Sequence, residues 1–226
     1  MKLFLAVPVY GAMDANFAQC LIHLMVKPPC EILLGINAGD SLVSRSRNTL
    51  TANFLASDCT HLMFADSDLI FSPEHVARLM KHNEKVVAGF YPKKDQGPIQ
   101  WCCNALPGNP PPRPDGLQPV RFMGTGFMRV HRTVFEKMIS RYDCDIRYKS
   151  DTTGRDEWDF WTVGVHAYPD GSRRYLSEDW FFCQRWLDLG GTVWGDTRIC
   201  LKHVGIAAYP LKSQEPEIVD SAPSVP

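Results

Sequence analysis

Residues 61–71 read HLMFADSDLIF, in which an apolar run of strand length leads directly into two aspartates one residue apart. A continuous apolar run predicts a strand that is covered on both faces, as in a parallel sheet. Open α/β sheets bind their ligands at the carboxyl ends of such strands. Because two like charges are costly to bury there without a cation or hydrogen-bond donors, Asp66 and Asp68 are candidate ligands of Mn²⁺ or Mg²⁺. A solvated Asp-Ser-Asp turn is the alternative interpretation.

Strand and helix patterns alternate around this stretch. Continuous apolar runs predict the strands, while apolar residues at helical spacing and the start signal Ser72-Pro73 predict the helices. The predicted strands cover 2–9, 31–36, 60–65 and 85–90, and the predicted helices cover 14–26, 42–56 and 72–81. This alternation predicts an α/β fold with a mostly parallel central sheet flanked by helices.

The helix over 42–56 has two unlike sides. Its apolar side is expected to consist of Leu42, Val43, Leu50, Phe54 and Leu55. Its other side is expected to carry Arg45, Arg47 and Asn48. Arginines on a helix are usually solvated, but these follow a strand and a glycine-containing loop, from which they could reach a phosphate or a base.

The second half of the chain has a smaller, antiparallel character. Short antiparallel strands are expected over 120–131, around Gly124, Thr125 and Gly126. Proline-rich residues 104–119 predict a surface loop, and residues 142–175, which lack a clean period, predict a lid or a substrate loop. Further predicted elements are helices over 132–141 and 178–189 and strands near 192–194 and 199–203, before a flexible tail over 210–226.

The composition is that of a globular chain with no bias toward a polyanionic partner. The chain has 226 residues, 45% of them hydrophobic, and a net charge of −1, which argues against a dedicated DNA or RNA binder. No apolar stretch approaches the length of a membrane span, and Pro8 cuts the apolar start too early for a signal peptide. Eight cysteines without a C-x-x-C pair favour a reducing compartment, so a cytoplasmic protein is expected.

Two further signals lie late in the chain. In YLSEDWFFCQRW, residues 175–186, Glu178 and Asp179 open an apolar helix, where helix capping by Ser177 alone would explain the acids. Capping does not explain the four aromatic rings that follow, on which a sugar ring could stack. His203 ends the last strand pattern, and it is either a metal ligand or a structural histidine.

The order of these signals is more specific than any one of them. It runs VPVY (7–10), SRSRN (44–48), D-x-D (66–68), VVAGFYPK (86–93), GTGF (124–127), SEDW (177–180) and H-x-G (203–205). Over residues 1–206 this order resembles the GT-A glycosyltransferases, above all their small single-domain viral and bacterial members and more loosely the yeast mannan-polymerase type. The resemblance implies one catalytic domain over 1–209, with a nucleotide-binding half (1–92) and an acceptor half (93–209).

The resemblance also implies which residues bind the nucleotide-sugar donor. Pro8, Val9 and Tyr10 would line the base pocket, and Arg45 and Asn48 would contact the nucleotide. Asp66 and Ser67 would meet the ribose or a metal-bound water, while Asp68 would bind the metal, with His203 as a distant second ligand. Gly124, Thr125 and Gly126 would lie against the donor sugar.

The implied activity is metal-dependent transfer of a sugar from a UDP- or GDP-sugar to a hydroxyl acceptor, with Mn²⁺ or Mg²⁺ as cofactor. Asp179 would be the general base that deprotonates the acceptor, and Glu178 would orient the acceptor or the sugar. The acceptor is expected to be a glycan. A modified DNA base is disfavoured by the net charge, although basic residues at 129, 132, 137, 141, 147, 149 and 155 could form a local strip. Inverting and retaining chemistry both stay open.

Two other functions compete with this one. A sugar nucleotidyltransferase shares a similar sheet, but it needs a glycine-rich loop with basic residues after the first strand, and VPVYGAMDANF contains none. A glycan-binding module without catalysis would have no need of the D-x-D pair, the Glu-Asp pair and the late histidine together.

Overall fold

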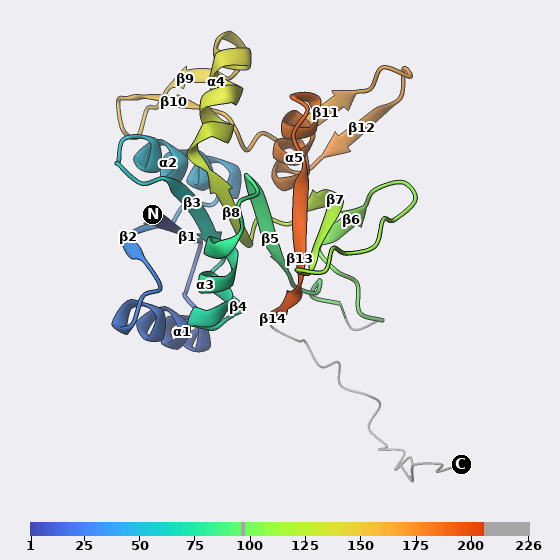
Figure 1. Cartoon of the computed structure of the whole chain (residues 1–226). Helices are drawn as coiled ribbons and strands as arrows, with labels where there is room; N and C mark the ends of the chain where they lie inside the picture. The colour runs from blue at the N-terminus through green and yellow to red at the C-terminus, as the bar shows by residue number, and fades with distance from the viewer. Residues whose placement is uncertain (96–97, 206–226) are drawn as a thin grey trace, which may run out of the picture.

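An eight-stranded mixed sheet forms the centre of the molecule, in the order β2-β1-β3-β8-β5-β13-β7-β6 (Figure 1). The computed structural model describes residues 1–95 and 98–205, so the expected tail 210–226 and the end of the expected domain, 206–209, lie outside the described residues. The strands are β1 (Lys2–Val9), β2 (Glu31–Ala38), β3 (His61–Ala65), β5 (Val86–Phe90), β6 (Cys103–Ala105), β7 (Leu117–Met123), β8 (Phe127–His131) and β13 (Val193–Cys200). Strand β1 pairs in parallel with β2 and β3, and β13 with β5. The predicted α/β class is confirmed.

Antiparallel pairing enters where the sequence predicted a smaller antiparallel portion. Strand β8 is inserted between β3 and β5 and pairs antiparallel with both, while β7 pairs antiparallel with β13 and β6. Local sequence patterns do not predict this strand order, because β8 pairs with strands that lie many residues earlier in the chain. The insertion places Gly124–Gly126, the turn before β8, beside the end of β3, where the Asp66 amide donates to the Gly126 carbonyl at 2.9 Å.

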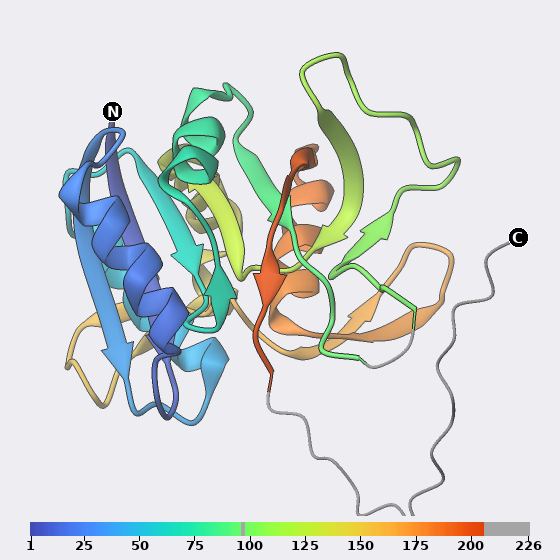
Figure 2. The same ribbon diagram turned by 90° about the horizontal axis from the view of Figure 1, so that it is seen from below.

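Helices cover both faces of the sheet (Figure 2). Side chains alternate along β1, so that Leu3, Leu5 and Val7 pack on one side with α1 (Ala15–Val26) and α3 (Pro73–Lys81). Phe4 and Ala6 pack on the other side, with α2 (Val43–Leu55), α4 (Arg132–Ile146) and α5 (Glu178–Asp188). This alternation is the period of two expected of a strand that is buried on both faces.

Local capping chemistry sets where the helices begin. Asp14 Oδ1 accepts hydrogen bonds from the backbone amides of Asn16 and Phe17, at 2.8 and 3.3 Å, at the start of α1. Pro73 occupies the first turn of α3, and the Ser72 amide donates to His75 Nδ1 at 3.2 Å. None of the helices among residues 1–95 and 98–205 has the length and apolarity needed to cross a bilayer.

The region 142–175 differs from the prediction of a segment without elements. Helix α4 continues to Ile146, and two short antiparallel pairs follow, β9 (Arg147–Lys149) with β10 (Asp156–Trp158) and β11 (Gly164–Ala167) with β12 (Arg173–Leu176). Strands of three or four residues are too short to show a period. The bounds of the strands predicted near 192–194 and 199–203 are also wrong. Strand β13 runs unbroken over Val193–Cys200, and β14 (Lys202–His203) is a separate strand.

Candidate functional site

Strand β14 brings His203 to the D-x-D segment. It pairs antiparallel with β4 (Leu69–Ile70), with His203 opposite Leu69. The Val204 amide donates to the Asp68 carbonyl at 2.8 Å, which fixes the two segments side by side. Two signals that are far apart in the sequence thus lie next to each other.

Asp68 and His203 face each other through two hydrogen-bond acceptors. His203 Nδ1 donates to the Pro92 carbonyl at 2.8 Å, because a carbonyl oxygen only accepts, and Nε2 lies 3.5 Å from Asp68 Oδ1. That Asp68 oxygen is buried and has no hydrogen-bond partner among the described residues. In the neutral imidazole, Nε2 presents a lone pair toward Asp68, so a proton or a cation is needed between them.

Lys94 supplies one positive charge at this carboxylate, with Nζ 2.5 Å from Asp68 Oδ2. Burial by itself would raise the pKa of Asp68, but Lys94 and an imidazole of His203 that carries a proton toward the carboxylate together lower it to about 2. Asp68 is therefore ionised at every pH at which the protein would work.

Arg47 holds the other aspartate of the pair. Its Nη2 donates to both Asp66 oxygens, at 3.0 and 3.2 Å, and its Nε lies 3.6 Å from Glu178 Oε1. The side chain is only 4% exposed, and Nε and Nη1 have no hydrogen-bond partner among the described residues. One arginine thus links the end of β3 to the start of α5.

The Gly-Thr-Gly turn closes the site behind Asp66. The Gly126 amide donates to the Tyr91 hydroxyl at 2.9 Å, and Tyr91 is buried. A Cβ at Gly126 would lie 2.8 Å from Asp66 Oδ2 and from the Tyr91 hydroxyl, so only glycine leaves both groups in place. Thr125 is buried here as well, and its hydroxyl has no partner in the described part of the chain.

The Glu178-Asp179 pair lies at the first turn of α5. Asp179 Oδ1 accepts from the Trp180 amide at 2.8 Å and from the Ser177 hydroxyl. Burial raises the pKa of both carboxyls, and the nearby Arg47 charge offsets part of that rise. A carboxylate with a raised pKa is a stronger base, as general-base catalysis requires.

A cavity of about 260 Å³ opens beside the D-x-D segment. Its lining contains the predicted base-pocket residues Pro8, Val9 and Tyr10, and the predicted donor residues Asp66, Ser67 and Asp68. The loop before α2 and the first turns of α2 complete the wall, with Asp40, Ser41, Val43 and Ser46. Six of the predicted site residues therefore share one cavity.

Two predicted nucleotide contacts are engaged elsewhere. Arg45 is half exposed and forms a two-point ion pair with Asp40, at 2.7 and 2.9 Å. Asn48 is buried, with its carboxamide between Asp159 Oδ1, at 2.8 Å, and the Trp161 amide, at 3.1 Å. Both residues line a second cavity, of about 600 Å³, on the other side of the α2 start. Their role in donor binding stays a prediction.

The two sides of α2 were assigned wrongly in part, since Leu50 and Phe54 are buried as predicted. Arg47 and Asn48 are buried, whereas Leu42 and Val43 are exposed. The correct signal was present, because Arg47 stands three and seven residues before Leu50 and Phe54 and so shares their helix face. The burial of Arg47 was not predicted, because a charged side chain is rarely buried on the apolar face of a helix unless it has partners. Lys94 and Tyr91 are the site residues that sequence reasoning missed, and for Arg47 it missed the burial and the contacts with Asp66 and Glu178.

The local basic strip that the sequence allowed for DNA is only partly engaged inside the protein. Arg129 is buried and donates to the Glu84 carbonyl at 2.7 Å, and Arg132 donates to carbonyls at the end of α2. Lys137 donates to the Leu189 carbonyl, Arg147 pairs with Asp156, and Arg155 donates to Asn53. Arg129 and Arg132 are therefore unavailable to phosphates, whereas the other members of the strip are exposed and DNA stays a disfavoured alternative.

The three residues predicted to bind the metal do not all lie together. Among residues 1–95 and 98–205 no three His, Cys, Asp or Glu side chains converge as a metal cluster. Asp68 and His203 face each other, whereas Asp66 is held by Arg47. The two facing acceptors and the orphaned Asp68 oxygen fit a divalent cation that takes its remaining ligands from a substrate and water.

No family model and no curated protein matches this sequence. Solved structures do match its fold. A197 from STIV aligns over 91% of this chain and 87% of its own, with a TM-score of 0.54 and 17% identity. GalNAc-T7, solved with UDP, GalNAc and Mn²⁺, aligns over 97% of this chain but only 46% of its own, with a TM-score of 0.53 and 11% identity. The chain has a GT-A-like fold.

Proposed function

We propose that the protein is a glycosyltransferase that moves a sugar from a nucleoside-diphosphate sugar to a hydroxyl acceptor. The observation that carries this proposal is the meeting of Asp68 and His203, 3.5 Å apart, at the rim of the cavity that Pro8–Tyr10 and Asp66–Asp68 line. The GT-A-like fold supports it, since GalNAc-T7 binds UDP, GalNAc and Mn²⁺ on a similar fold. Domain limits at 1–209 belong to the same proposal.

Asp68 and His203 would hold the divalent cation, Mn²⁺ or Mg²⁺. The Pro92 carbonyl fixes the His203 tautomer, an arrangement typical of histidine ligands. When bound, such a cation would offset the negative charge that develops on the leaving diphosphate. Lys94, which now pairs with Asp68, can turn its charge to the same diphosphate.

The remaining residues would position the reactants. The cavity beside Pro8, Val9 and Tyr10 would take the base and ribose, and the turn Gly124-Thr125-Gly126 would lie against the donor sugar. Arg47 keeps Asp66 and Glu178 oriented toward each other. Asp179, whose Oδ1 is fixed by the Trp180 amide, would accept the proton of the acceptor hydroxyl in an inverting reaction.

A melting-temperature panel tests this function. UDP, GDP and their sugars, each with and without Mn²⁺, should raise the melting temperature in a Mn²⁺-dependent way for one nucleotide class, because ligands stabilise the state that they bind. Asp68→Asn should remove the Mn²⁺-dependent part. Asp58→Asn, at an exposed carboxylate paired with Lys2 on the surface, is the matched control and should keep it.

The same samples supply the outcome that would overturn the proposal. Slow hydrolysis of the donor, measured as release of the free nucleoside diphosphate, should accompany the shift. It should vanish in Asp68→Asn. If no nucleotide changes the melting temperature and no donor is hydrolysed, the protein is not a nucleotide-sugar transferase. Pyrophosphate release from a nucleoside triphosphate and a sugar phosphate would identify a nucleotidyltransferase instead.

A further inference from the structure

Two arginines that form no ion pair in the described part of the chain lie beside the candidate base. Arg121 on β7 and Arg174 on β12 make no ion pair with any carboxylate in the described part of the chain. Both contact aromatic rings, and the charge of Arg121 also contributes, from beyond ion-pair distance, to the lowered pKa of Asp170. This differs from Arg47, Arg78, Arg113 and Arg147, each of which pairs with a carboxylate. An arginine left without an anion is a candidate ligand for one from outside.

One stack of aromatic rings holds the two arginine side chains in place. Phe122 and Trp180 stack with centroids 5.2 Å apart and planes 18° from parallel. The Arg121 guanidinium lies over the Phe122 ring at 5.1 Å, and that of Arg174 lies over the Trp180 ring at 5.7 Å. We call Arg121, Phe122, Trp180 and Arg174 the arginine platform. Cation–π contacts hold a guanidinium in place without neutralising its charge.

The arginine platform adjoins the catalytic end of α5. Trp180 follows Asp179 directly, and its amide is the donor that fixes Asp179 Oδ1. Strand β12 carries Arg174 and ends at Leu176, one residue before the Ser177 that also donates to Asp179. A molecule on the platform therefore lies close to the group that would deprotonate it.

The hairpin selects which of its arginines takes part. Leu176, two residues after Arg174, is fully buried, so Arg174 lies on the strand face turned toward α5. Arg173 and Tyr175 lie on the opposite face, where Tyr175 is 71% exposed. Arg173 has the same charge and the same strand as Arg174 but is outside the platform.

The size of the platform favours a small anion over a nucleic acid. Only two guanidiniums belong to it, because Arg173 lies on the opposite face of β12 and Arg185 donates to backbone carbonyls. Arg129 and Arg132 are engaged in the same way. A polyanion needs a longer row of free cations.

We propose that the acceptor is a sugar carrying an anionic group, a phosphate or a carboxylate, which the platform binds while the sugar hydroxyl lies at Asp179. This inference rests on the proposed function, because it names the acceptor class of the same site. Phe122 is fully buried, so the partly exposed ring of Trp180 would take the apolar face of the sugar, and the two guanidiniums would take the anion through charge-assisted hydrogen bonds.

Direct binding to the whole protein tests the inference. Calorimetric titration at low salt compares glucose 6-phosphate, glucuronate and neutral glucose, with a short single-stranded DNA as a fourth probe. Either anionic sugar should bind about tenfold more tightly than glucose, the factor expected of one added charge-assisted contact. The stronger of the two anionic probes identifies the group. The double variant Arg121→Gln/Arg174→Gln should lose this preference, and Arg173→Gln should keep it.

Three outcomes would overturn the inference: equal binding of glucose, a preference that survives in the double variant, or DNA binding that is tighter than that of both anionic sugars. If the double variant does not fold, the exposed Arg174→Gln alone decides in the same way. Failure here is distinct from failure of the proposed function. A Mn²⁺-dependent nucleotide shift without any anion preference refutes only the acceptor class, whereas an anion preference without any nucleotide shift refutes sugar transfer.

Discussion

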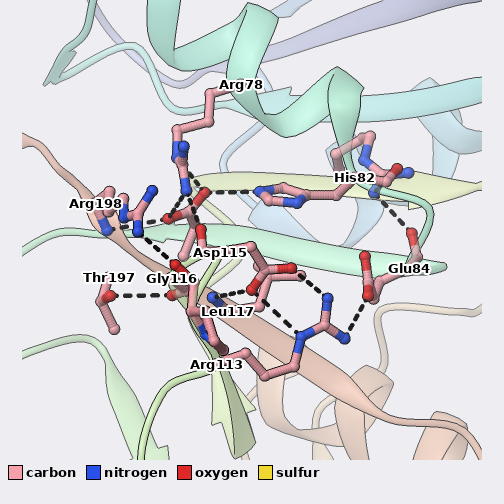
Figure 3. Close-up of polar contacts among 12 residues, drawn as sticks. Arg78, His82, Glu84, Arg113, Asp115, Gly116, Leu117, Thr197 and Arg198 are labelled. Carbon is pink, nitrogen blue, oxygen red and sulfur yellow. Dashed lines mark hydrogen bonds and ion pairs between the residues drawn. The ribbon is translucent and has the colours of Figure 1, made fainter.

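Two buried arginine–carboxylate clusters occur in this protein, and they are built differently. In the Asp196 cluster, the carboxylate of β13 accepts from Arg78, from His82 Nε2 at 2.8 Å and from the Arg198 amide at 3.0 Å. Figure 3 shows Arg78 of α3, His82 at the end of α3 and Arg198 of β13 around this carboxylate, with Arg78 also donating to the Asp115 carbonyl. In the Arg47 cluster, one arginine contacts Asp66 and Glu178 and still leaves two buried nitrogens without partners.

The difference lies in which groups are saturated. Both oxygens of Asp196 have two partners, so this carboxylate has nothing left to offer a ligand. Arg78 Nε makes no aligned hydrogen bond, but it lies 2.6 Å from Asp196 Oδ2. Arg47 is 4% exposed, yet its Nε and Nη1 lack hydrogen bonds, and burial raises the pKa of Glu178 and Asp179 nearby. Buried polar groups are normally satisfied, so an incomplete set marks the cluster with a function beyond folding.

The largest expected effect is on the saturated cluster. Asp196→Asn should lower the free energy of unfolding by about 3 kcal/mol, because it leaves Arg78 and His82 without their buried counter-charge. Urea unfolding followed by circular dichroism measures the loss, with Asp58→Asn as the exposed control that should leave the transition unchanged. If both variants unfold alike, the Asp196 cluster is not structural and the comparison fails.

The next effect has the opposite sign for stability. Asp179→Asn should reduce sugar transfer by about 10²–10⁴-fold, the range for loss of a general base, while the fold becomes slightly more stable at neutral pH. Burial raises the pKa of Asp179, so the folded state disfavours its charge, and the wild-type protein should gain stability as the pH falls through that raised value. The variant lacks this gain.

Activity assays and melting curves at pH 5 and pH 8 measure both parts of this prediction. Asp188→Asn, at the exposed end of the same helix, is the matched control and should change neither. A variant that loses activity and also melts earlier at every pH would show that Asp179 stabilises the fold, as Asp196 does.

The sequence predicted well those elements that are determined by neighbouring residues in the chain. The apolar run into Asp66 and Asp68, the start of α3 at Ser72-Pro73 and the strand over 2–9 are set within a few residues, and the structure has them at those places. The insertion of β8 between β3 and β5 is set by pairing across long loops, and no local pattern encodes it. The strands β9–β12 are too short for a period to reveal.

The candidate site divides in the same way. Asp66, Ser67 and Asp68 follow from one strand end, and they share a cavity with Pro8–Tyr10 because parallel strands end at one edge. The sequence pointed to Arg47 as a polar residue, but its burial could not be predicted from polarity, because that burial depends on Asp66 and Glu178 of other elements. Lys94 likewise reaches Asp68 only through the turn that follows β5.

The smallest expected effect concerns Arg47 itself and sharpens the comparison most. Its charge lowers the pKa of Glu178 and of Asp179 against the effect of burial, so Arg47→Met should let both rise further. A smaller fraction of each group is then ionised at low pH, and the acid limb of the pH–rate profile should move to higher pH. Arg155→Met, which contacts the same helix through Asn53, should leave the profile in place.

Stability separates this variant from Asp196→Asn. Although Arg47 is the more buried arginine, Met at this position should cost less than the loss of Asp196, because two of the Arg47 nitrogens have no hydrogen bond to lose. An unmoved acid limb would show that Arg47 does not act on the two carboxyls. A loss of stability as large as that of Asp196→Asn would show that both clusters serve the fold. Arg47 makes few hydrogen bonds, so its removal can cost that much only through its charge. That charge would then be what allows Asp66 and Glu178 to be buried together.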